Sequence, residues 1–200
     1  MILTVQFNTE KNPGLFLQAA HEILQAHPFA RFTIVGDGVL RGPLEELAAR
    51  LQISWAVHFT GWASAADLPK MLAGVDIVLN PSLRAWSETF CIANIEVMSM
   101  AVPLVTFAVG GIGEYVQDPT LNTNHSTSFN DSSGDFSVSA NAVVVHRATP
   151  QALARAALHL IRRPALRRAI GQSGRNTVLA HFSIERQMNQ YSQLYRSLVS

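Results

Sequence analysis

The chain has 200 residues, of which 48% are hydrophobic and 14% charged, so it can form one globular domain with a substantial core. Its net charge of +1 gives no long-range field for nucleic acid or an acidic membrane. The single cysteine, Cys91, excludes a disulfide framework within the chain and a thiolate metal cluster, and it leads us to expect a reducing, cytoplasmic compartment.

The sequence predicts no targeting segment, no transmembrane helix and no metal site. Residues 1–4 lack the basic region of a signal peptide. No apolar run approaches the ~18 residues that a membrane-spanning helix needs. The seven histidines are scattered, with no pair at the i, i+4 spacing of metal ligands.

Six short segments rich in apolar and β-branched residues predict six buried strands. They lie at residues 2–7, 31–35, 56–59, 76–79, 104–107 and 142–146. Helical patterns occupy about residues 13–26, 43–51, 64–72, 90–101, 151–163, 165–179 and 183–198. Asn12 and Thr149 each precede a proline, and a capping residue followed by proline is typical of a helix start.

Strands that alternate with helices predict a doubly wound parallel α/β sheet of the Rossmann type, as one domain over residues 1–200. Right-handed crossovers place the loops that follow the strands at one sheet edge, where ligands bind. The loops with unusual residues are 10–12, 36–38, 60–62, 80–88 and 110–114. Residues 118–141 differ, since Ser, Thr, Asn, Asp and Gly dominate them, and they predict a mobile surface insertion.

Several of these loops could bind an anion. Gly36, Gly38, Gly110 and Gly111 could expose backbone N–H groups, and Lys11 adds a cation at the start of the first helix. For each glycine alone, a turn with positive φ is the better explanation. The chain has no Gly-x-Gly-x-x-Gly after its first strand and no Walker-type loop, which disfavours ordinary dinucleotide binding and ATP hydrolysis.

Two carboxylates, Glu88 and Glu96, bracket a mostly apolar segment that opens a helix. Because an apolar setting penalises a charge that nothing binds, they are candidates for holding the hydroxyl groups of a ligand. A structural salt bridge for Glu96 and a partnership of Glu88 with the helix dipole explain the spacing equally well. A general acid/base pair for glycoside hydrolysis also stays open, since sequence spacing does not give the distance between the two carboxylates.

At these residues the sequence resembles the C-terminal, donor-binding half of GT-B glycosyltransferases of the retaining family 4 type. The resemblance rests on Glu-x7-Glu from Glu88 to Glu96, and its flanking motifs cover nearly the whole chain. Those motifs are Glu10-Lys11-Asn12, Val35-Gly36-Asp37-Gly38, Phe59-Thr60-Gly61 and Gly110-Gly111-Ile112-Gly113-Glu114-Tyr115.

The resemblance implies a nucleotide diphosphate sugar as donor, transfer to an acceptor with retention, and no divalent metal. It implies that Glu88 contacts the sugar hydroxyls, Glu96 the ribose, and Lys11 the diphosphate. Charge developing on the leaving diphosphate would then be stabilised electrostatically. We expect Glu88 and Lys11 to be catalytic. The expected donor-binding positions are Gln6, Gly36, Gly38, Thr60, Trp62, Thr89, Phe90, Cys91, Ile92 and Glu96.

The chain departs from the family pattern at three points. Gln6 stands where the family usually has an arginine on the diphosphate, and Cys91 where it often has glycine. The chain also begins directly at the first strand, so we expect the N-terminal acceptor domain to be absent. The last helix usually reaches that domain, which leaves its stripe of Met188, Tyr191, Leu194, Tyr195 and Leu198 either partly exposed or packed on its own domain.

The sequence therefore supports two main hypotheses. The first is a glycosyltransferase domain that binds a nucleotide sugar and transfers its glycosyl group to an unknown acceptor. The second is a nucleotide-sugar-binding fragment, or a degenerate copy, without turnover. A GT-B relative that hydrolyses or epimerises a nucleotide sugar is a third.

Overall fold

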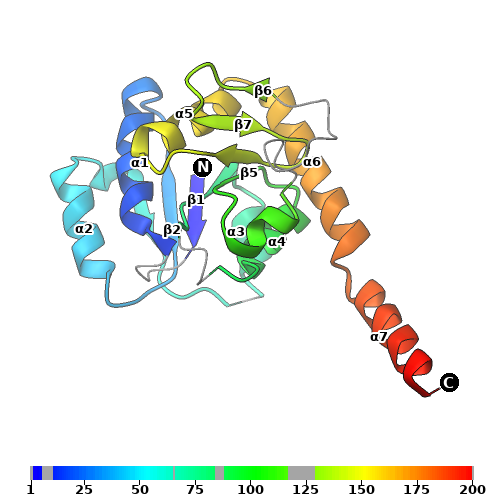
Figure 1. The fold of residues 1–200 in the computed structure, drawn as a ribbon. Coiled ribbons are helices and arrows are strands. Elements are labelled where there is room, and N and C mark those ends of the chain that lie inside the picture. Colours follow the sequence, from blue (N-terminus) through cyan, green and yellow to red (C-terminus); the bar gives the residue numbers. More distant parts are fainter. Residues whose placement is uncertain (1, 6–10, 65, 84–87, 117–128, 200) are drawn as a thin grey trace.

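The computed structural model describes residues 2–5, 11–64, 66–83, 88–116 and 129–199 (Figure 1). A sheet with the strand order β3-β2-β1-β4-β5-β8-β7-β6 forms its centre. The strands are β1 (Ile2–Val5), β2 (Phe32–Val35), β3 (Val57–Phe59), β4 (Ile77–Asn80), β5 (Leu104–Thr106), β6 (Phe129–Asn130), β7 (Phe136–Val138) and β8 (Val143–Val145).

The predicted fold class is confirmed. Each of the six predicted strand segments overlaps an observed strand, namely β1 to β5 and β8, and these six pair in parallel in the order β3-β2-β1-β4-β5-β8. Strands β2, β4, β5 and β8 are largely buried, because they carry apolar side chains on both faces, whereas β3 is only partly buried. Leu79 packs on one side of β4 and Val78 on the other.

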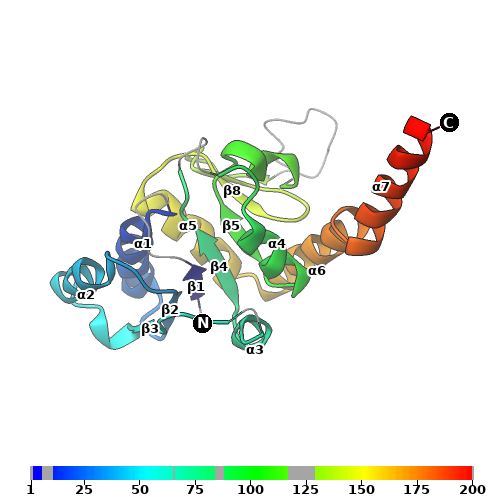
Figure 2. The same cartoon turned by 90° about the horizontal axis from the view of Figure 1, so that it is seen from below.

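Helices cover both faces of this sheet. They are α1 (Pro13–Ala26), α2 (Arg41–Arg50), α3 (Leu68–Leu72), α4 (Ile92–Ser99), α5 (Pro150–Ile161), α6 (Pro164–His181) and α7 (Ile184–Val199), with 3-10 turns η2 (Ser54–Ala56) and η3 (Gly110–Glu114). One core cluster holds α1, α2 and α5, and the other holds α3, α4 and the end of α6. Figure 2 shows α1 and α4 on opposite sides of β1 and β4.

One of the two predicted helix caps is confirmed and the other is wrong. The Thr149 hydroxyl accepts a hydrogen bond from the Ala152 N–H at 3.2 Å, as expected of a helix N-cap. Asn12 makes no such bond, because its backbone is left-handed at φ 49° and ψ 51°. Pro13 still opens α1 at a position where a missing N–H costs nothing.

The prediction of a mobile surface insertion over residues 118–141 is wrong from residue 129 onwards. Residues 117–128 lie outside the described ranges, but β6 and β7 add two antiparallel strands to the sheet edge beside β8. Phe136 and Val138 are buried in the core. The polar composition of this segment gave no sign of such packing. The Asp135 carboxylate is buried as well, and its contacts with Arg147 and Arg155 offset the cost of burying a charge.

Helix α7 extends away from the body of the domain (Figure 1). Its apolar stripe is solvent-exposed throughout. Of the two possibilities that the sequence left open, exposure and packing on its own domain, the structure shows exposure. The exposed residues are Ile184, Met188, Tyr191, Leu194, Tyr195 and Leu198. None of the helices in the described part of the chain is long and apolar enough to cross a membrane.

Helices α4 and α6 approach so closely that only glycine fits at their contact. A Cβ added at Gly171 in α6 would lie 2.1 Å from the carbonyl oxygen of Ala101, which follows α4. Because that neighbour is backbone, a side chain would force the two helices apart. This contact fixes how α4 lies against the sheet.

We predict that Gly171→Ala lowers the free energy of unfolding by about 1 to 3 kcal/mol, through overpacking. Gly42→Ala is the matched control, since Gly42 is also helical but a Cβ there meets nothing within 4 Å. The control should be neutral or stabilising by up to about 1 kcal/mol, because alanine favours the helix. Urea unfolding of both variants measures this, and equal stabilities would contradict the close approach.

Candidate functional site

The strand order reverses between β1 and β4, and open α/β sheets bind ligands in a crevice at such a reversal. From β1 the chain proceeds to β2 and β3 on one side, and β4 then pairs with the other side of β1. Because α1 and α4 leave the sheet on opposite faces, the carboxyl ends of β1 and β4 are the point where such folds bind ligands. Lys11 lies in the connection after β1, and Glu88 in the connection after β4.

The structure brings Lys11 and Glu88 together as an ion pair between Nζ and Oε1, although they are 77 residues apart. The Glu88 side chain is 1% exposed and that of Lys11 is 18% exposed. The second carboxylate oxygen of Glu88, Oε2, is buried without a hydrogen bond from any described residue. A buried carboxylate oxygen that receives no hydrogen bond from the protein is suited to accept one from a ligand.

Cys91 lies beside this pair. Its Sγ is 4.0 Å from Lys11 Nζ and 3.3 Å from Asn80 Nδ2, and its backbone is left-handed at φ 59° and ψ 73°. Burial raises the pKa of the thiol to about 11, with Lys11 opposing the shift and Glu88 adding to it. The thiol is therefore neutral near pH 7, which argues against a nucleophilic role.

The first turn of α4 faces the same region. Cys91 occupies its N-cap position without a side-chain cap, which leaves backbone N–H groups of the turn for a ligand or water. Thr89 and Ile92 are exposed, whereas Phe90 is half-buried. Glu96 lies further along α4, half-buried, and it forms no ion pair with a described residue. The structural salt bridge considered for Glu96 is therefore not observed within the described ranges.

The loops after β2 and β3 form a second group at the same sheet edge. Gly36 and Gly61 pair as an isolated antiparallel bridge, with Gly36 N donating to Gly61 O at 2.9 Å. Thr60 Oγ1 donates to the Gly61 carbonyl at 2.8 Å, and Trp62 is 84% exposed. Thr60 and Trp62 thus follow β3, in the loop that the sequence analysis singled out.

The glycine N–H groups are largely engaged within the protein. Gly36 N donates to Gly61 O, Gly38 N to Asp37 Oδ1 at 2.8 Å, and Gly111 N to Glu88 O at 3.0 Å. Positive φ, as the turn explanation expects, occurs at Gly36, Gly38 and Gly110, whereas Gly111 is not among the positive-φ glycines and lies within η3. Gln6 lies outside the described residues.

Three residues of this site were not predicted from the sequence. Asn80 ends β4, Asn94 lies in α4 and Tyr115 follows η3, and hydrogen bonds connect all three to one another. Asn94 carried a signal that could have identified it. It is a polar residue within an apolar helical run, and such residues are usually hydrogen-bonded inside the protein.

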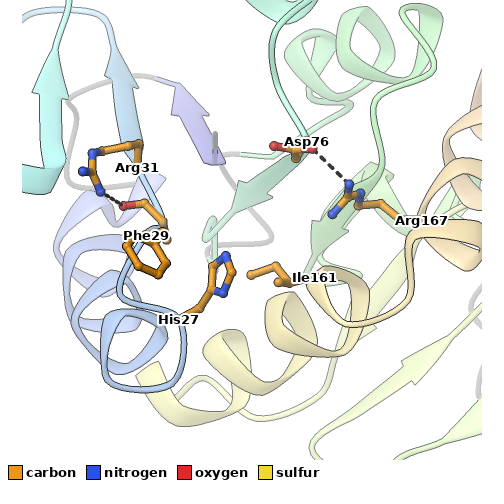
Figure 3. A pocket seen from close by; sticks show the side chains of 7 residues that line it. His27, Phe29, Arg31, Asp76, Ile161 and Arg167 are labelled. Atoms are coloured by element: carbon orange, nitrogen blue, oxygen red, sulfur yellow. Dashed lines mark hydrogen bonds and ion pairs between the residues drawn. The ribbon is translucent and has the colours of Figure 1, made fainter.

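A cavity of about 180 Å³ lies at the opposite, amino-terminal edge of the sheet (Figure 3). His27, Phe29, Arg31, Asp76 and Arg167 line it. Asp76 and Arg167 form an ion pair at 3.0 Å, and Arg31 donates to a backbone carbonyl, so these charged groups already have partners. No cluster of three or more potential metal ligands occurs among the residues that the structure describes.

Comparisons with known proteins match this chain to one family. The family model described as glycosyl transferases group 1 matches residues 1–177. The chain is 26% identical to alpha-D-kanosaminyltransferase of Streptomyces kanamyceticus over 94% of its own length and 43% of that protein. It is 31% identical to D-inositol 3-phosphate glycosyltransferase of Segniliparus rotundus over 54% of its own length and 24% of that protein.

Solved structures share the fold. The C-terminal domain of the glycosyl transferase group 1 protein LpcC from Francisella tularensis has a TM-score of 0.71 and 20% identity, covering 92% of this chain and 85% of that one. Anabaena HepE in complex with UDP has a TM-score of 0.79 and 19% identity, covering 98% of this chain and 48% of that one. The fold is that of one half of a GT-B glycosyltransferase, and the chain spans less than half the length of these curated relatives.

We predict that Lys11→Met destabilises the fold by about 3 kcal/mol, because it leaves the buried Glu88 carboxylate without its cation. Urea unfolding measures the loss. Arg50→Met is the control, since Arg50 pairs with Glu46 at 3.8 Å on the surface and should cost under about 1 kcal/mol. Adding Glu88→Gln to Lys11→Met should recover part of the loss. A double variant as unstable as Lys11→Met alone would show that the buried charge is not the cause.

We also predict that iodoacetamide alkylates Cys91 slowly at pH 7.5 and faster as the pH approaches the thiol pKa of about 11. Lys11→Met should slow alkylation further at a fixed pH, because the loss of a nearby cation raises the thiol pKa. Mass spectrometry of the chain measures the rate, with the urea-unfolded chain as reference. A faster rate in Lys11→Met, at a pH where that variant remains folded, would contradict this arrangement.

Proposed function

Because this chain belongs to the glycosyl transferases group 1 family, we propose that it is the donor-binding half of a glycosyltransferase that uses a nucleotide diphosphate sugar. The related proteins are named for glycosyl transfer, and the HepE structure contains UDP. UDP is therefore the first nucleotide to test.

The observation that carries the proposal is the Lys11–Glu88 pair at the crevice between β1 and β4. A diphosphate needs cationic and N–H donors, and Lys11 and the uncapped first turn of α4 supply both. A sugar needs acceptors for its hydroxyl groups, and Glu88 Oε2 is a buried acceptor without a described partner. One crevice thus offers complementary groups to both parts of the donor.

The remaining roles follow the same division. Glu96 would bind the ribose hydroxyls, and the exposed Trp62 beside Thr60 would contact the base. Backbone groups of Thr89, Phe90, Cys91 and Ile92 would approach the sugar and the diphosphate. Gln6 would contribute a hydrogen bond but no charge. We expect no metal ion, because Lys11 would provide the countercharge for the leaving diphosphate.

We propose that transfer retains the anomeric configuration and that no side chain of this site acts as the nucleophile. The Cys91 thiol is neutral, since burial raises its pKa, and Glu88 is engaged by Lys11. The site would therefore act on the leaving group. Negative charge developing on the diphosphate would be stabilised by Lys11 and by the α4 N-terminus.

Transfer also needs an acceptor, which we propose is bound by an N-terminal GT-B domain. The exposed apolar stripe of α7 is a surface on which such a domain could pack, and α7 lies beyond the residues that the family model matches. The cytoplasmic location is also a proposal and rests on the single free thiol.

A second function, nucleotide-sugar binding without turnover, is favoured by Gln6. A neutral side chain there would weaken the stabilisation of a leaving diphosphate. Fusion to a matching N-terminal domain distinguishes the two functions. Donor binding without glycosyl transfer in the fusion would support the binding module.

We predict that calorimetry detects binding of at least one of UDP, GDP, ADP or their sugars at millimolar concentration or below. Loss of a charged hydrogen bond is worth about 1.5 to 3 kcal/mol, so Glu96→Ala should weaken binding of the free nucleotide by about tenfold or more. Glu88→Gln should leave free-nucleotide affinity nearly unchanged and remove the added affinity of the sugar.

Glu46→Ala, at an exposed position of α2, is the control for these variants. No binding of any of these ligands to the unmodified chain would overturn both proposed functions. Equal effects of Glu88→Gln and Glu96→Ala on free nucleotide would contradict the division between sugar and ribose.

A further inference from the structure

The turn η3 packs against the backbone of the segment that carries Glu88. The Gly111 N–H donates to the Glu88 carbonyl at 3.0 Å. Gly111 also lies close to Thr89, the residue after Glu88. A Cβ added at Gly111 would be 1.8 Å from the Thr89 carbonyl oxygen. This direct backbone contact packs η3 against the segment Glu88–Cys91, and Tyr115 follows immediately after η3.

Tyr115 contacts this segment through its ring. The rings of Phe90 and Tyr115 are 5.5 Å apart in an edge-to-face arrangement, and Phe182 lies 5.4 Å from Phe90 and 6.0 Å from Tyr115. Phe182 is the C-cap residue that follows α6, so the three rings connect the site to α6. Edge-to-face pairs of this kind favour one orientation of the neighbouring ring.

Tyr115 contacts the same segment again through its hydroxyl. Asn94 Nδ2 donates to Tyr115 Oη at 3.0 Å, and Asn80 Nδ2 donates to Asn94 Oδ1 at 2.8 Å. Asn80 Nδ2 also lies 3.3 Å from Cys91 Sγ, and Asn80 Oδ1 accepts from Ser82 N at 3.0 Å. The chain of contacts therefore runs from Tyr115 to the thiol that lies beside Lys11.

The network is buried and each member depends on the next. Asn94 is 2% exposed and Tyr115 is 3% exposed, so neither can exchange a lost partner for bulk water without rearrangement. Burial raises the pKa of the Tyr115 phenol, which keeps its hydroxyl protonated. Cys91 itself holds a left-handed backbone, a conformation that a non-glycine residue keeps only where its surroundings impose it.

We propose that Tyr115 is a positioning residue for donor binding, which holds Phe90 through its ring and the Cys91 turn through Asn94 and Asn80. This inference rests on the proposed function. Tyr115 does not touch the donor; it fixes the segment that carries Glu88 and the first turn of α4. Removal of its hydroxyl deletes the acceptor of the Asn94 hydrogen bond, so the turn at Cys91 is held less firmly. The ring contacts with Phe90 and Phe182 remain.

Tyr115→Phe tests the proposal, because it deletes the hydroxyl and retains the ring. Tyr191→Phe is the matched control, since Tyr191 lies on the exposed face of α7. We measure the dissociation constant of the best-binding nucleotide sugar, the rate at which iodoacetamide alkylates Cys91, and the melting temperature. Tyr115→Phe should weaken donor binding about fivefold to tenfold, which is the effect of one net hydrogen bond. It should also speed alkylation several-fold, and the control should change neither.

A second variant separates positioning from simple stabilisation. Asn94→Leu removes the amide that links Tyr115 to Asn80, so its effect and that of Tyr115→Phe on donor affinity should not add in the double variant. A lower melting temperature with unchanged affinity and unchanged alkylation, both measured well below it, overturns the proposal. Additive effects on affinity also overturn it.

The outcome is separable from that of the proposed function. If the unmodified chain binds no nucleotide sugar, the proposed function fails. The alkylation rate of the single cysteine then decides alone whether Tyr115 holds the turn. An alkylation rate in Tyr115→Phe equal to that of the unmodified chain would then reject the positioning role as well.

Discussion

The contact between Lys11 and the buried Glu88 carboxylate is the interaction on which the site depends. It joins the connection after β1 to the connection after β4, two segments that meet only because these strands are neighbours in the sheet. A carboxylate that is 1% exposed is costly to bury unless a cation lies in contact with it. The sheet order, the approach of α4 and the hold of η3 on the Glu88 backbone all serve to maintain this pair.

Much of the architecture could be predicted because strand signals are local. Runs such as residues 104–107 and 142–146 are apolar and β-branched, and alternation with helices leaves few possible topologies. The two strands β6 and β7 could not be predicted in this way. They lie in a polar stretch, although Phe136 and Val138 are buried and the buried Asp135 carboxylate contacts Arg147 and Arg155.

The sequence drew attention to individual residues of the candidate site but not to their contacts. Spacing and loop position drew attention to Lys11 and Glu88, but their pairing depends on the fold. The network of Asn80, Asn94 and Tyr115 was not foreseen, because its hydrogen bonds connect separate elements. The N–H groups of Gly36, Gly38 and Gly111 are bonded inside the protein, and only the first two of these glycines have the positive φ expected of a turn. Local sequence pattern can thus point to candidate site residues, whereas the contacts between them depend on the tertiary structure.

The central claim is that the crevice at Lys11 and Glu88 binds a nucleotide diphosphate sugar. The most direct test is a crystal structure of the chain with the best-binding nucleotide sugar. The account predicts the diphosphate within hydrogen-bond distance of Lys11 Nζ and the first-turn N–H groups of α4, with a sugar hydroxyl on Glu88 Oε2. A ligand bound elsewhere, for instance in the cavity at the amino-terminal sheet edge, with the Lys11–Glu88 crevice empty, would contradict it.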